Sequence, residues 1–280
     1  MKLNIYIDKC PCGSTKLIYK CKCYSPQSKT LHREAVVIKN GASNYGNPKC
    51  YAYPIKGCSK NISKEHFFTK AILKKYSPVK NSVKISGFPW QDEPLSYVSL
   101  DRFQSKILCE THNNILSKLD EVGLEFFNAY SEVEKLNSYK KGYNKIYLFN
   151  GYDIEKWMLK CSLGYFFSKN LQFMGERVVD RSYPPEWLLK ILFSDSFLPG
   201  TRGMYLVGDI GQAAAKGGVT INLIARLNPA PPPQVIIDGY EILLNGLLFI
   251  LALENPSQGS LKKTTYRPSE LIFNGEEGGR

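Results

Sequence analysis

The chain has 280 residues, of which 43% are hydrophobic, and it carries a net charge of +12. This length allows one large or two ordinary domains with a sizeable core. The apolar run at residues 247–253 is far too short to span a bilayer, and residues 1–8 alternate like a strand and do not resemble a signal peptide. We therefore expect a soluble cytoplasmic protein with no membrane partner.

The positive charge is concentrated at the N-terminal end. Residues 1–80 hold fifteen Lys and one Arg against Asp8, Glu34 and Glu65, whereas the remainder is close to neutral. Such a basic block suits a polyanion, because side chains that neutralise phosphates release counterions. A solvated lysine-rich surface without such a partner gives the same count, so charge alone leaves both interpretations open.

Four cysteines follow the first predicted strand: Cys10, Cys12, Cys21 and Cys23. In a cytosolic chain, cysteine clusters are more often metal sites than disulfides. Four thiolates in a short hairpin predict a Cys₄ zinc site, so residues 1–30 are predicted to form a zinc knuckle. Residues 10–14, CPCGS, resemble the start of a SEC-C zinc motif, although Lys22 separates the last two cysteines. The alternative to a zinc site is that these four cysteines are free thiols in a flexible N-terminal segment.

The next elements in the chain are a short strand over Ala35–Ile38 and a Gly/Asn-rich loop. A helix is predicted over Asn113–Tyr130, because its apolar residues recur at helical spacing. These apolar residues are Ile115, Leu116, Leu119, Val122, Phe126 and Phe127. The polar stretch 131–150 is predicted to be a connector.

Residues 49–130 resemble the HNH (ββα-metal) endonuclease superfamily. The resemblance is carried by Cys50 and Cys58, then Glu65-His66, then Cys109-Glu110-Thr111-His112-Asn113 at the start of the predicted helix. In that family a β-hairpin presents a DH or EH pair, a helix carries the last metal ligand, and structural zinc often pins the two together. The resemblance implies such a nuclease domain over residues 31–130.

Phosphodiester hydrolysis needs an activated water and a stabilised leaving oxygen. His66 is assigned as the general base, because a histidine of near-neutral pKa can accept the proton of water. Glu65 and Asn113 are assigned as ligands of a catalytic Mg²⁺ or Mn²⁺, because hard cations take carboxylate and amide oxygens. The alternative for His66 is an ordinary surface histidine after a lysine-rich stretch.

The remaining ligands predict a structural zinc ion. Cys109-x-x-His112 is a knuckle-to-helix pair, and Cys50 and Cys58 complete a tetrahedral Cys₃His site. A small module with many lysines buries little apolar surface, so a bound zinc ion would supply stability that its core lacks.

The chain departs from the family pattern at two places. Asn113 stands where the third letter is usually His, and Gln104 stands where the middle Asn is usual and is expected to brace the loop in the same way. Asp120 lies two helical turns after Asn113 on the same face. Its predicted role is a solvated helix residue, with an outer-sphere role at the metal as the alternative.

Residues 151–280 predict an α+β domain of helices followed by antiparallel strands, with no catalytic signature. The predicted helices are Ile154–Ser168 and Glu186–Phe193, and the predicted strands are Met204–Ile210, Val219–Leu227, Gln234–Leu244 and Leu247–Glu254. This domain is expected to supply target choice, self-association or a partner surface. Trp157, Trp187 and Cys161 are predicted core residues, and Trp90 is a better candidate than the other two tryptophans for contact with a substrate.

The sequence as a whole therefore predicts an α+β protein with a zinc-stabilised N-terminal module. The expected function is a metal-dependent HNH-type endonuclease that acts on double-stranded DNA, in a setting such as prokaryotic or phage defence. A non-catalytic zinc-stabilised nucleic-acid-binding module and an RNase or toxin on the same scaffold are the alternatives.

Overall fold

The structure is a computed structural model. It describes residues 2–4, 29–32, 34–77, 81–85, 96–137, 145–168, 172–173, 176–177, 183–207, 219–228, 234–244, 247–256, 264–268 and 271–272. These residues form a mixed α/β structure that is compatible with the predicted α+β class. The four cysteines of the predicted zinc knuckle, Cys10, Cys12, Cys21 and Cys23, lie outside the described residues, and so does Trp90.

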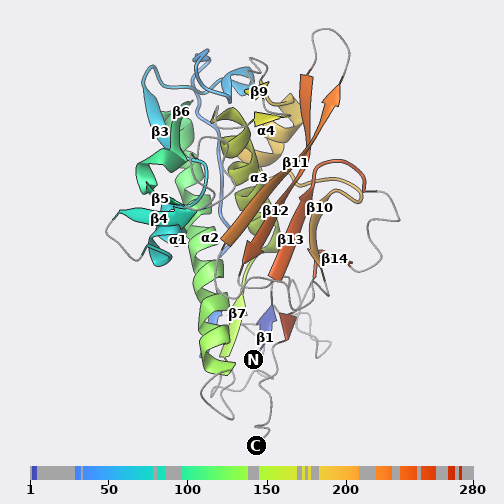
Figure 1. Cartoon of the computed structure of the whole chain (residues 1–280). Helices are drawn as coiled ribbons and strands as arrows, with labels where there is room; N and C mark the ends of the chain where they lie inside the picture. The colour runs from blue at the N-terminus through green and yellow to red at the C-terminus, as the bar shows by residue number, and fades with distance from the viewer. Residues whose placement is uncertain are drawn as a thin grey trace, which may run out of the picture.

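Helix α3 lies at the centre of the described structure (Figure 1). The α-helices are α1 (Lys70–Lys75), α2 (Glu110–Asn137), α3 (Gly151–Phe167) and α4 (Glu186–Phe193). Helix α3 contacts α2, α4 and two strands of the C-terminal sheet. All of its residues except Tyr152 and Phe167 are buried, so it is a core helix and has no solvated face.

The contact between α2 and α3 depends on one apolar stripe and one glycine. Leu116, Leu119 and Val122 of α2 are almost fully buried, as their helical spacing predicts. At Gly123, an added Cβ would lie 2.2 Å from the ring of Trp157 on α3. Because such a distance is a severe clash, only glycine lets the two helices approach this closely.

An antiparallel hairpin leads directly into α2. Its strands are β3 (Ile62–His66) and β6 (Gln104–Cys109), and Ile62 pairs with Cys109 while His66 pairs with Gln104. Helix α2 begins at Glu110, immediately after β6. The long excursion between the strands includes α1, β4 (Ser82–Ile85), β5 (Ser96–Ser99) and η3 (Leu100–Phe103).

The larger sheet covers one side of α3 and is antiparallel, as predicted for the C-terminal half. Its order is β11-β12-β13-β10-β14, with β10 (Gly203–Val207), β11 (Val219–Asn228), β12 (Gln234–Leu244), β13 (Leu247–Ala252) and β14 (Thr264–Tyr266). A second sheet has the order β15-β1-β7-β2, with β1 (Lys2–Asn4), β2 (Lys29–His32), β7 (Lys145–Leu148) and β15 (Leu271–Ile272). Strands β1, β7 and β2 run parallel. The short strands β8 (Gln172–Phe173) and β9 (Glu176–Arg177) pair with each other.

Two sequence predictions of local structure are wrong. Residues 35–38 form no strand, and the backbone N–H of Val36 donates instead to the Asp153 carboxylate of α3 at 2.8 Å. The stretch 131–150 is not a plain connector, because α2 continues to Asn137 and β7 joins β1 to β2 in the second sheet. Buried Tyr147 and Leu148 anchor β7, and buried Phe149 follows them directly.

Buried side chains from the hairpin, α2, α3 and the larger sheet form one continuous core. Leu108, Leu119, Trp157 and Leu251 each expose at most 1% of their surface. The core therefore extends across the sequence boundary near residue 150. In the described part of the chain, no helix combines the length and apolar character needed to cross a membrane.

Candidate metal centre and adjoining pocket

Three cysteines and one histidine converge where the hairpin meets α2. Cys50 and Cys58 flank the 3-10 turn η2 (Tyr53–Ile55), Cys109 ends β6, and His112 lies in the first turn of α2. Their ligand atoms all lie within 4.8 Å of one another, and all four residues are buried. This arrangement could hold a metal ion, and it brings together the four residues that the sequence predicted as ligands.

The distances within this cluster are short and similar. His112 Nδ1 lies 3.5 Å from Cys50 Sγ, 3.6 Å from Cys58 Sγ and 3.2 Å from Cys109 Sγ. One nitrogen therefore faces three sulfur atoms at once, whereas a thiol offers only one weak donor. A shared cation satisfies all four groups together.

Burial and hydrogen bonds set the protonation of these ligands. Burial raises the pKa of Cys50 and of Cys58, so an uncompensated thiolate is costly at either position. At Cys109 burial acts in the same direction, but hydrogen bonds with the backbone at His112 and Ser59 hold the pKa below its usual value. Burial lowers the pKa of His112 to about 4, so its imidazole is neutral at pH 7.

Asn40 fixes the orientation of the His112 ring. The ring Nε2 lies 2.7 Å from Asn40 Oδ1, and the Asn40 amide nitrogen donates to the carbonyl of Ile55 at 3.0 Å. Because an oxygen acceptor requires a proton on Nε2, Nδ1 is left with the lone pair that faces the sulfur atoms. The sequence prediction did not include Asn40, whose only local signal is an Asn-Gly dipeptide typical of a turn.

We expect Asn40→Ala to weaken metal binding at this cluster by about 10- to 100-fold, because the ring loses its orienting acceptor. The measurement is competition with a chromophoric chelator on the full chain. Asn114→Ala is the matched control, since Asn114 is an exposed amide on α2. Equal metal affinity in the two variants would contradict the role assigned to Asn40.

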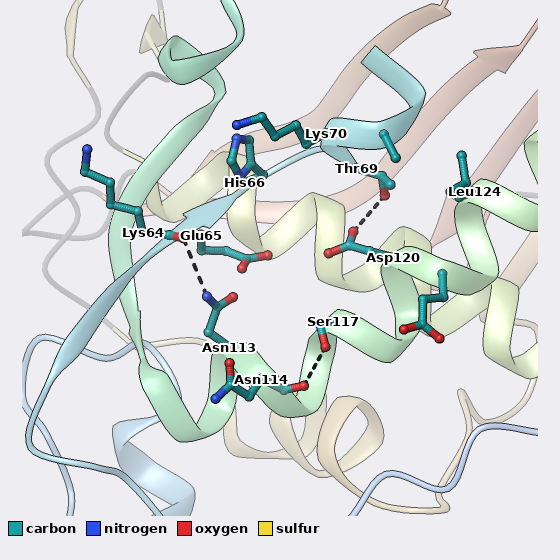
Figure 2. Close-up of a pocket in the computed structure, with 12 residues that line it drawn as sticks. Lys64, Glu65, His66, Thr69, Lys70, Asn113, Asn114, Ser117, Asp120 and Leu124 are labelled. Carbon is teal, nitrogen blue, oxygen red and sulfur yellow. Dashed lines mark hydrogen bonds between the residues drawn. The ribbon is translucent and has the colours of Figure 1, made fainter. Parts of the chain in front are cut away.

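A surface pocket of about 330 Å³ adjoins this cluster, between β3, α1 and α2. Its lining includes the three residues that the sequence assigned to catalysis, Glu65, His66 and Asn113. The Glu65 carboxylate lies between Asn113 and Asp120, whereas the His66 ring leaves β3 toward Lys70 (Figure 2). This divergence follows from strand geometry, in which successive side chains point to opposite faces.

Glu65 belongs to a buried ionic network. Its Oε1 lies 2.5 Å from Lys160 Nζ of α3, and the same ammonium lies 2.7 Å from Asp120 Oδ2. Burial raises the pKa of Glu65 to about 7, although Lys160 acts in the opposite direction. Burial would lower the pKa of Lys160, but Glu65 and Asp120 outweigh it and raise that pKa, so the ammonium stays charged.

His66 is partly buried and is neutral at pH 7. Burial, followed by the positive charges of Lys70 and Lys160, lowers its pKa to about 4. Its Nε2 atom is buried and has no hydrogen-bond partner among the described residues. A neutral ring with a free buried nitrogen is available to accept a hydrogen bond or a proton, depending on its tautomer.

Asn113 and Asp120 occupy the α2 side of the pocket. The Asn113 amide nitrogen lies 3.5 Å from the Lys64 carbonyl, an orientation that leaves its amide oxygen for another partner. Asp120 is not the solvated helix residue that the sequence predicted. It accepts a hydrogen bond from Thr69 Oγ1 at 2.7 Å as well as pairing with Lys160, and Trp157 Nε1 donates to the same Thr69 oxygen at 2.9 Å.

Lys160 is the main residue of the pocket region that the sequence prediction missed. It lies among apolar helix positions, and its neighbours Trp157 and Cys161 are almost fully buried, as predicted. A lysine at such a position is a signal, because buried lysines need a partner. The partners could not be identified from sequence, because Glu65 and Asp120 lie far away along the chain.

Gln104 lies opposite His66 in the hairpin register.

In comparisons with known proteins, no protein-family model, no curated protein and no solved structure matches the chain.

Proposed function

We propose that the chain is a zinc-stabilised, metal-dependent nuclease of the HNH type. The observation that carries the proposal is the pocket at the junction of β3 and α2, which Glu65, His66 and Asn113 line together. The hairpin runs directly into the helix, and the Cys₃His cluster joins the two elements. A ββα unit with this ligand order is the arrangement that the sequence resemblance implies.

Zinc is the proposed ion of the Cys₃His cluster. Three thiolates and one imidazole form a typical structural zinc set. Zinc–sulfur bonds of about 2.3 Å and zinc–nitrogen bonds of about 2.0 Å at tetrahedral angles place sulfur and nitrogen about 3.5 Å apart. The sulfur–nitrogen distances of 3.2–3.6 Å in this cluster fit that geometry. The N-terminal cysteines remain a prediction of a second zinc ion.

The pocket residues divide the chemistry of hydrolysis between them. Glu65 and the Asn113 amide oxygen are the proposed ligands of Mg²⁺ or Mn²⁺, which would neutralise the scissile phosphate and the leaving oxygen. His66 accepts the proton of the attacking water, because its ring is neutral at pH 7. Lys64 and Lys70 line the same pocket and offer positive charge to a phosphate backbone.

The test is a cleavage assay on the full chain with duplex DNA, single-stranded DNA and RNA in parallel, with Mg²⁺, Mn²⁺ or EDTA. We expect metal-dependent cleavage of duplex DNA. Cleavage of RNA alone would assign the scaffold to an RNase or toxin. Binding of nucleic acid without cleavage under any metal condition would overturn the proposed activity and leave a binding module.

The affinity of the pocket for Mn²⁺ is expected to rise with pH up to about 7 and to level off above it. Below its pKa of about 7, Glu65 is protonated, and the proton competes with the cation. The expected slope is about tenfold in affinity per pH unit below pH 7 for one displaced proton. Calorimetric titration at several pH values measures it. Glu65→Gln should bind Mn²⁺ weakly at every pH, and a flat profile in the unmodified chain would contradict the assignment.

A further inference from the structure

Lys160 is held in an unusual environment for a lysine side chain. Only 1% of its side chain is exposed, although it belongs to α3 and lies beneath a pocket formed by β3, α1 and α2. Its ammonium group has three oxygen neighbours: Glu65 Oε1 at 2.5 Å, Asp120 Oδ2 at 2.7 Å and the His66 carbonyl at 3.3 Å. The ammonium donates hydrogen bonds to Asp120 and to the His66 carbonyl, and its contact with Glu65 is an ion pair.

The neighbours of this ammonium are themselves fixed. The Thr69 hydroxyl donates a hydrogen bond to the Asp120 carboxylate and accepts one from the Trp157 indole. The Glu65 side chain exposes only 5% of its surface. The two carboxylates converge on one point because both contact the same nitrogen. With the ammonium between them, the three groups carry a single net negative charge when both carboxylates are ionised.

We propose that Lys160 is a positioning residue that acts as a built-in cation between Glu65 and Asp120, where it orients Glu65 and limits the affinity of the pocket for divalent cations. The inference rests on the proposed function, in which Glu65 and Asn113 bind the catalytic cation. A carboxylate pair without an internal cation attracts divalent ions strongly, whereas a neighbouring ammonium repels them. The cation site is thereby kept weak enough to exchange with solvent.

The test compares two variants for which the proposal predicts opposite effects on Mn²⁺ binding. Lys160→Ala removes the internal positive charge, but it also removes a group that lowers the pKa of Glu65. Binding is therefore compared above the pH at which Glu65 ionises in each variant, where we expect Mn²⁺ to bind at least about tenfold more tightly to Lys160→Ala. Asp120→Asn removes one negative charge but keeps an oxygen for Thr69, and we expect Mn²⁺ to bind about tenfold more weakly. Binding is measured by calorimetry and by Mn²⁺ electron paramagnetic resonance on the full zinc-loaded chain. Glu125→Gln is the control, because Glu125 is an exposed carboxylate of the same helix.

A purely structural role of Lys160 gives a different result. In that case Lys160→Ala would only lower stability, and Mn²⁺ would bind with unchanged or reduced affinity. If Lys160→Ala is too unstable to purify without metal, Mn²⁺ should raise its yield and its Tm more than those of the unmodified chain, and failure to do so would overturn the proposal. Lys160→Arg should keep the affinity of the unmodified chain. If the unmodified chain binds no Mn²⁺ at Glu65, the proposed function fails and this inference with it.

Discussion

Replacing His66 with alanine is expected to lower the rate of metal-dependent DNA cleavage by a factor of about 10² to 10⁴, the usual contribution of a general base. The ring nitrogen Nε2 has no partner among the described residues, so its removal breaks no described hydrogen bond of that atom. The protein should therefore keep its fold and its zinc. The measurements are single-turnover cleavage of duplex DNA, zinc content and circular dichroism.

Added imidazole provides the control that separates proton transfer from loss of structure. If the missing group is a base, free imidazole should restore part of the activity of His66→Ala, and the rescue should grow as pH rises through about 6.5, where imidazole loses its proton. In the unmodified chain His66 is neutral far below that pH, because its pKa is about 4. Full activity of His66→Ala without imidazole would remove His66 from the mechanism.

Replacing Cys109 with serine is expected to release one zinc ion per chain and to destabilise the fold. Cys109 closes the hairpin at its pairing with Ile62 and also faces His112 across the cluster. We expect a loss of at least about 3 kcal/mol in the free energy of unfolding, a fraction of the roughly 10–16 kcal/mol with which zinc binds in small structural sites. Zinc is measured by atomic absorption and stability by chemical denaturation.

Cys161 offers the matched control for this experiment. It is a free, fully buried cysteine of α3 that is not part of the cluster. Cys161→Ala should keep the full zinc content, although it loses some core packing. If Cys109→Ser keeps the same zinc content as Cys161→Ala, the cluster is not the zinc site.

The sequence predicted those features that follow from local spacing. The limits of α4 agree with the prediction, and α2 and α3 differ from it only at their ends, because their apolar residues recur at helical intervals. The four residues of the cluster were predicted to lie together because Cys109 and His112 are three residues apart at a helix start. Residues 35–38 were wrongly predicted to be a strand. A strand needs a neighbouring strand to pair with, and an apolar run alone does not show whether one is present.

The contacts that complete the site could not be found in the same way. Asn40 reaches His112 across 72 positions of the chain, and Lys160 reaches Asp120 across 40. Asp120 was expected to be solvated, but Lys160 of α3 pairs with its carboxylate, and only 28% of the Asp120 side chain is exposed. Such pairings depend on the three-dimensional packing of helices, which residue spacing within one segment does not determine.

The burial of α3 has a consequence for whether the hairpin and helix can function as a portable module. A fragment ending near residue 150 would leave Glu65 and Asp120 without their common ammonium, and Gly123 without the indole that it admits. Such a fragment could not be excised, or grafted onto another protein, without losing the support of its own pocket.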